Sequence, residues 1–194
     1  MKTDINISFV SGFVFKLSNF FCYNSFQKQL KMTGNVTTEF RLACHFGELE
    51  KLTNLLRRKE EIDVKQLERR NLLLRAVMYG QSEIVRLLLT VGVNVNQSNN
   101  FVGSRPLHFA CREGNLSIVE LLLENGADID AIIERLNCSP LHIVVFHKNT
   151  SITKLLLKKG CKTNVRSHKG QTALELALNK GYLDGVKQLT FNDK

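Results

Sequence analysis

The chain has 194 residues, of which 43% are apolar and 23% charged, with 12 Gly, 2 Pro and no Trp. This balance is typical of a soluble globular protein, and it excludes a disordered chain, a collagen and a polytopic membrane protein. The net charge of +9 is concentrated at one end, because residues 134–194 hold eleven basic and four acidic side chains. A partner attracted by charge is therefore expected at the C-terminal third.

The first 36 residues stand apart from the rest. The apolar stretch from Ile7 to Phe15 resembles the core of a signal peptide, but Lys16 interrupts it and no small-residue cleavage site follows. The stretch is also too short and too charged to cross a bilayer. Because Met32 precedes the first regular pattern, we expect residues 1–36 to be a dispensable or disordered leader. A targeting segment or a membrane-surface anchor is the alternative, and whether residues 1–31 are translated stays open.

From residue 37 onward the chain repeats with a period of 33 or 34 residues. The register is set by a small or β-branched residue that recurs in five units as Ala43, Ala76, Ala110, Val144 and Ala177. Four residues later comes the end of a short helix, where a left-handed residue is needed and glycine is favoured. These positions are Gly47, Gly80, Gly114, Lys148 and Gly181, so Lys148 is the exception.

A second helix is predicted after each of these breaks. Apolar residues follow at helical spacing, as in Ile84, Val85 and Leu88 of the second unit. An Asn- or Asp-rich turn then begins after Gly92, Gly126 and Gly160. Because neither helix can bury its apolar stripe alone, neighbouring units must stack. The pattern predicts five units, at residues 37–66, 67–99, 100–133, 134–166 and 167–194.

The central units resemble a known family. The segment RPLHFACREGNLSIVELLLENGADIDA at 105–131 is similar to the ankyrin repeat pattern TPLHxAAxxGHxxIVxxLLxxGADVNA, and so is SPLHIVVFHKNTSITKLLLKKGCKTNV at 139–165. The last unit keeps Thr172 and Gly181 but has Ala173 and Glu175 where the family has Pro and His, and the first two units lack both. Over about residues 37–190, the resemblance implies an all-α ankyrin-repeat solenoid of stacked helix-turn-helix units with projecting β-turn loops.

No catalytic or metal-binding motif is present, so we expect no enzyme activity, metal or cofactor. His108 and His142 occupy the H of the PLH motif, where the resemblance implies that they tie one repeat to the next by hydrogen bonds. Five cysteines without a CxxC pair fit neither a disulfide framework nor a zinc site, and they predict reduced thiols in the cytoplasm or nucleus. Cys111 is expected to be a packed small hydrophobe.

The resemblance implies that recognition uses the loop tips and the ends of the first helices, which line a concave face. By register, the expected partner-binding residues are Met78, Tyr79, Phe101, Val102, Arg112, Glu113, Arg135, Leu136, Phe146, His147 and Lys169. We expect the large apolar members, namely Phe101, Val102, Leu136 and Phe146, to be exposed anchors ringed by polar groups. The alternative is that neighbouring loops pack these side chains together.

A second candidate surface is the basic cluster of Lys158, Lys159, Lys162, Arg166 and Lys169. It could bind an acidic protein segment, nucleic acid or anionic lipid, or be a solvated surface. Nucleic acid is disfavoured because no aromatic residues are interleaved for base stacking.

The sequence favours a monomeric, non-enzymatic protein–protein interaction module, such as a scaffold or adaptor, that binds a partner of unknown identity through its concave face. One alternative is a regulatory inhibitor similar to the ankyrin proteins that mask Rel-type transcription factors. Another is a fragment of a larger ankyrin-containing channel, toxin or ubiquitin-ligase adaptor.

Overall fold

The computed structural model describes residues 36–58, 68, 71–98 and 103–192. The described helices lie almost entirely in the compact unit Phe40–Lys194. Within the described residues all regular structure is helical, apart from an isolated bridge between Ile133 and Cys138. None of the helices in this part of the chain is long and apolar enough to cross a membrane.

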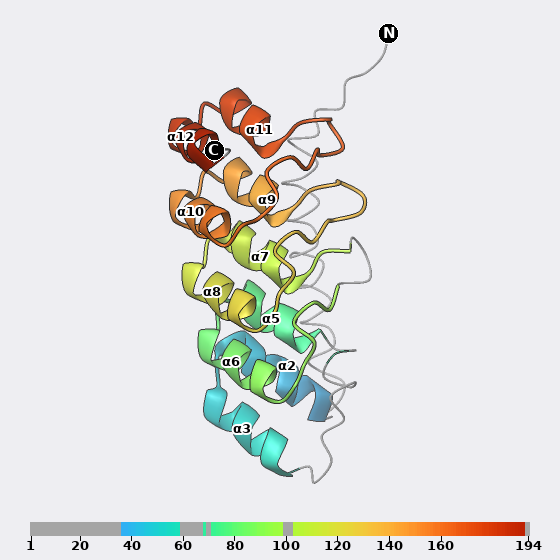
Figure 1. Cartoon of the computed structure of the whole chain (residues 1–194). Helices are drawn as coiled ribbons and strands as arrows, with labels where there is room; N and C mark the ends of the chain where they lie inside the picture. The colour runs from blue at the N-terminus through green and yellow to red at the C-terminus, as the bar shows by residue number, and fades with distance from the viewer. Residues whose placement is uncertain (1–35, 59–67, 69–70, 99–102, 193–194) are drawn as a thin grey trace. The chain divides into compact units, whose positions relative to one another are not determined.

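The described helices form five consecutive pairs, each joined by a tight turn (Figure 1). The pairs are α2 (Val36–Phe46) with α3 (Leu49–Arg58), α5 (Leu72–Met78) with α6 (Ser82–Thr90), α7 (Pro106–Glu113) with α8 (Leu116–Glu124), α9 (Pro140–Phe146) with α10 (Thr150–Lys158), and α11 (Ala173–Asn179) with α12 (Leu183–Asn192). The first helices of the pairs stack on one another, as α5 on α7, α7 on α9 and α9 on α11, and α6, α8, α10 and α12 form a second row. The predicted stack of helix pairs is thus confirmed.

The helices begin where the sequence offers a cap. Pro106 and Pro140 stand at the first turn of α7 and α9, where a missing N–H costs nothing. The last unit lacks this proline, and there Thr172 and Glu175 cap α11 reciprocally. Glu175 N donates to Thr172 Oγ1 over 3.3 Å, and Thr172 N donates to Glu175 Oε2 over 2.8 Å. The departure of this unit from the PLH pattern therefore replaces one cap with another.

The turn inside each pair requires a left-handed residue. The four glycines at this position have φ between 61° and 74°, and Lys148 adopts the same conformation with φ 56°. A Cβ on Gly114 would lie 3.0 Å from Asn149 Nδ2 of the next unit. One repeat later, Tyr182 stands at the position that corresponds to Asn149. Its hydroxyl donates to Thr150 Oγ1 over 3.1 Å. Lys148 therefore fits the turn geometry but retains the strain of a left-handed side chain.

The core lies between the two rows of helices. The five register residues, Ala43, Ala76, Ala110, Val144 and Ala177, are all fully buried. On α8, Leu122 is buried and Glu124 is exposed, so the apolar stripe of this helix faces the core. Cys111 is also fully buried, as expected of a packed small hydrophobe.

Candidate protein-binding surface

The two PLH histidines link each repeat to the following loop. His108 Nδ1 accepts a hydrogen bond from Arg105 N at 3.0 Å, so Nε2 carries the proton and donates to Ala131 O at 2.8 Å. Burial lowers the pKa of His108 to about 4, which keeps the ring neutral at pH 7. His142 repeats the pattern, with Nε2 at 3.1 Å from Gln171 O, and burial lowers its pKa too. The structure therefore confirms their structural role.

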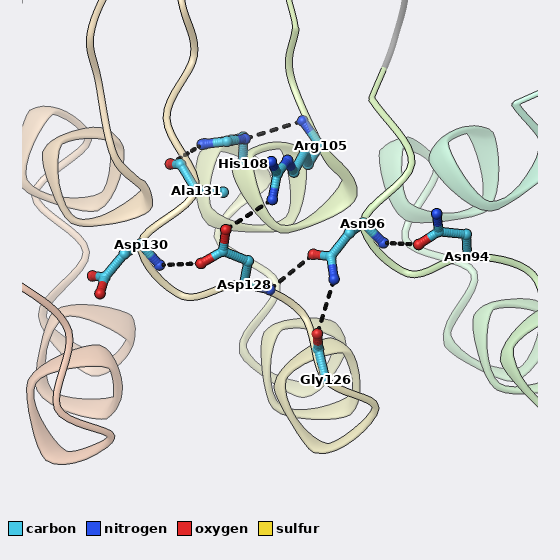
Figure 2. A network of polar contacts seen from close by, with 8 residues as sticks. All are labelled: Asn94, Asn96, Arg105, His108, Gly126, Asp128, Asp130 and Ala131. Carbon is cyan, nitrogen blue, oxygen red and sulfur yellow. Dashed lines mark hydrogen bonds and ion pairs between the residues drawn. The ribbon is translucent and has the colours of Figure 1, made fainter.

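Asn and Asp side chains connect the loops of consecutive repeats (Figure 2). Asn96 Oδ1 accepts from Asp128 N at 2.8 Å, and the same contact recurs one repeat later, where Asp130 Oδ1 accepts from Lys162 N at 2.8 Å. Asp128 also pairs with Arg105 at 2.8 Å. These carboxylates are thus used in holding the loops together. In the described ranges, no group of three or more His, Cys, Asp or Glu side chains could hold a metal ion.

The last two residues of each first helix, or the residue just after it, form a row that we call the turn strip. It consists of His45 and Phe46, Met78 and Tyr79, Arg112 and Glu113, Phe146 and His147, and Asn179 and Lys180. Three large rings are exposed along the turn strip: Phe46 is 64%, Tyr79 39% and Phe146 40% accessible to solvent. A folded chain normally covers rings of this size where it can.

Neighbouring repeats contact each other along the turn strip. The rings of His45 and Tyr79 are edge-to-face, with centroids 4.2 Å apart and an interplanar angle of 84°. Gln81 Nε2 donates to His45 O over 3.3 Å at the same junction. At the other end of the strip, Lys180 Nζ lies 3.8 Å from the centroid of the Phe146 ring. The strip is therefore a row of mutually positioned side chains.

The centre of the turn strip is polar. Arg112 lies over the Phe109 ring, 4.9 Å from its centroid, and pairs with Glu113 through an Nε–H···Oε1 bond of 2.8 Å. His147 of the next repeat interacts electrostatically with both of these charges. Partial burial lowers its pKa, Arg112 and Lys180 lower it further, and Glu113 raises it. His147 therefore sits in a region of net positive potential.

The structure brings together six of the predicted partner-binding residues on the turn strip, namely Met78, Tyr79, Arg112, Glu113, Phe146 and His147. Arg135 and Lys169 are exposed on loops. Leu136 was expected to be exposed but is half-buried, because the next loop lies against it and His168 N donates to its carbonyl over 2.9 Å. Phe101 and Val102 lie outside the described residues.

The basic cluster is distributed over several elements. Lys158 ends α10, and Lys158, Lys159, Lys162 and Lys169 are exposed. Arg166 is exposed too, but its Nη1 already donates to Gly170 O over 2.6 Å and lies 3.3 Å from Oε2 of Glu175 on α11.

Two strip residues of the first repeat, His45 and Phe46, were not among the predicted binding residues. The repeat register indicates these two residues as well, because Met78 and Tyr79 occupy the same positions in the following repeat. The contact of His45 with Tyr79 extends the strip to the first repeat.

Comparison with known families agrees with the geometry. A family model of ankyrin repeats, in three copies, matches residues 40–133 and 130–194. No curated protein gives a significant match to the chain. Ankyrin repeats are generally protein–protein interaction modules, and the family is typically non-enzymatic. The matches span most of the sequence and all the helix pairs after the first turn of α2, and on that basis the chain belongs to the ankyrin repeat family.

Proposed function

We propose that this protein binds a partner protein through the turn strip. The observation that carries the proposal is the row of exposed rings, Phe46, Tyr79 and Phe146, at two adjacent register positions of the repeat. Aromatic residues, Met and Arg are enriched at the centres of protein interfaces, and aromatic and Arg side chains supply much of the binding energy. The strip combines all three types, with Met78 and Arg112 between the rings.

The strip is also held in place before any partner arrives. Tyr79 is fixed by the ring of His45, Phe146 by the ammonium of Lys180, and Arg112 by Phe109 and Glu113. Ordering a side chain on binding costs about 0.5–1.5 kcal/mol. Side chains that are already packed lose less of this freedom, which favours their use as a binding surface.

The proposed role is non-enzymatic and belongs in a reducing compartment, the cytoplasm or nucleus. The family's typical lack of enzyme activity supports the first part. The four cysteines of the described residues carry free thiols, and this supports the second. Burial raises the pKa of Cys44 and Cys161 to about 12, so these thiols are unreactive at neutral pH.

A comparative affinity purification tests the proposal. The full-length wild-type chain and a Tyr79→Ala/Phe146→Ala variant are used as baits in native cell extract, and captured proteins are identified by mass spectrometry. The matched control is Leu116→Ala/Leu183→Ala, which removes exposed apolar side chains, 37% and 71% accessible, from the second helices α8 and α12. We expect a partner captured by the wild type and the control but lost with the strip variant. Equal capture by all three baits would contradict the proposal.

A further inference from the structure

The chemistry of the turn strip changes along its length. The first two repeats contribute His45, Phe46, Met78 and Tyr79, none of which is an acid or a permanent cation. The last two contribute a further ring, Phe146, together with His147, Asn179 and Lys180, and exposed Lys148 directly follows His147. The strip therefore has an uncharged aromatic end and a basic end, and the basic end holds one ring beside its lysines.

The two lysines at the basic end are not paired with any carboxylate in the part of the chain that the structure describes. Among the described residues, neither Lys148 nor Lys180 lies within 4.0 Å of a carboxylate oxygen. The strip's own carboxylate, Glu113, is already bonded to Arg112. Lys180 rests on the Phe146 ring, a contact that uses one side of the ammonium and leaves N–H donors for another group.

The surroundings of this end have the same sign. His147 faces the cations Arg112 and Lys180 and the anion Glu113, and the first two outweigh the third in their effect on its pKa. The sequence from residue 134 onward carries eleven basic and four acidic side chains. A negatively charged group would therefore be attracted to the basic end both at contact distance and from farther away.

We propose that the occupant of the turn strip is an extended protein segment with carboxylates at one end, bound by Lys148 and Lys180, and a large apolar side chain at the other, packed against Phe46 and Tyr79. This inference rests on the proposed function and specifies the chemistry of the partner.

The repeat spacing sets the separation between the two parts of that segment. Packed helices lie about 8–10 Å apart, so the three steps from Tyr79 in the second repeat to Lys180 in the fifth cover roughly 27 Å. An extended chain rises about 3.3 Å per residue. The apolar anchor and the carboxylates should thus be separated by about eight residues.

A peptide selection tests this chemistry directly. A display library of random 16-residue peptides is selected on the full-length chain, and a fluorescein-labelled copy of an enriched peptide is titrated by fluorescence polarisation in 0.15 M NaCl. We expect enriched peptides to carry Asp or Glu about eight residues from an aromatic or large aliphatic residue. The variant Lys148→Gly/Lys180→Gln should bind the peptide about tenfold more weakly.

The matched control is Lys154→Gln/Lys187→Gln. It removes the same two charges from exposed positions on α10 and α12 of the second row. Its affinity should stay within about twofold of the wild type, because a change in net charge alone acts weakly at this salt concentration. Equal weakening by the two lysine pairs would overturn the inference.

The remaining outcomes separate this inference from the proposed function. Peptides without acidic residues that still lose binding with Tyr79→Ala/Phe146→Ala would overturn the acidic segment and support the strip as a binding surface. Peptides insensitive to that aromatic pair and to both lysine pairs would contradict both proposals. Displacement of the peptide by a 20-nucleotide oligo(dT) would show a general polyanion surface, and failure to enrich any peptide would likewise count against the acidic segment.

Discussion

The ammonium of Lys180, which follows α11 in the fifth repeat, lies 3.8 Å from the centroid of the Phe146 ring in the fourth repeat. The contact joins two consecutive repeats at the surface rather than in the core, since Phe146 is 40% exposed. It fixes the position of one aromatic ring and one charge of the turn strip together. Both proposals depend on this arrangement, which can be measured without any partner.

A double-mutant cycle measures the strength of that contact. Lys180→Gln removes the charge, Phe146→Leu removes the ring, and the free energy of unfolding in urea is compared for the two single variants and the double variant. A cation over an exposed ring contributes about 0.5–1 kcal/mol, and we expect a coupling energy of this size. Strictly additive single effects would mean that the two side chains are not in contact in solution.

The turn at Lys148 provides a second test. Relieving a left-handed side chain recovers about 1–2 kcal/mol, and the added freedom of glycine in the unfolded chain costs about 0.5–1 kcal/mol. Lys148→Gly should therefore raise the free energy of unfolding by roughly 0.5–1 kcal/mol. Gly114→Ala should have the opposite effect and lower the free energy of unfolding. The reason is that φ is 74° at this position and the new Cβ would lie 3.0 Å from Asn149 Nδ2. A destabilised Lys148→Gly variant would show that the lysine side chain has a stabilising role in this turn.

The core register is tested on α8. Leu122 is fully buried, and Leu122→Asp would place an unpaired charge in the core, so we expect a loss of more than about 4 kcal/mol in the free energy of unfolding. Glu124 is exposed, and Glu124→Ala should change it by less than about 0.5 kcal/mol. Chemical denaturation checks both values, and effects of similar size at the two positions would be incompatible with this helix register.

Stability should also depend on pH through His108. Its pKa is about 4 in the folded chain and about 6.5 in a model compound, so between these values the unfolded chain binds a proton that the folded chain does not. The His108 contribution to stability is therefore complete above pH 6.5 and falls by up to about 1.4 kcal/mol per pH unit as the pH drops towards 4, where it levels off.

The variant His108→Gln isolates this effect from other titrating groups. It should be less stable than the wild type at pH 7, because the link to Ala131 is lost or weakened, but should lose less stability between pH 7 and pH 5. His142 acts in the same direction in both proteins, since burial lowers its pKa as well. Identical pH slopes for the variant and the wild type would contradict a neutral, buried His108.

The sequence predicts the helix pairs because their determinants are local. The recurring small residue, the glycine four positions later and the apolar spacing each act within one repeat, and even Lys148 takes the conformation that the register requires. The contacts between repeats are less accessible to such reasoning. Which loop the side chain of Asn96 or Asp130 reaches depends on how the loops stack, and that stacking also half-buries Leu136.

The sequence predicts which register positions form the candidate surface, but it does not predict the side-chain contacts between repeats on that surface. The ends of the first helices could be read from the repeat, and six of the predicted residues lie there together. The cation over Phe146 and the ring pair of His45 and Tyr79 depend on side-chain directions across a repeat boundary, which the residue pattern does not specify.

The most direct test of the proposed function is the dissociation constant of the captured partner for three full-length proteins, measured by isothermal titration calorimetry. These are the wild type, Tyr79→Ala/Phe146→Ala and the control Leu116→Ala/Leu183→Ala. Truncating an interface anchor typically costs about 2 kcal/mol or more, so we expect the strip variant to bind at least about thirtyfold more weakly, while the control binds like the wild type. An unchanged dissociation constant for the strip variant, with its fold intact by circular dichroism, would contradict binding through the turn strip.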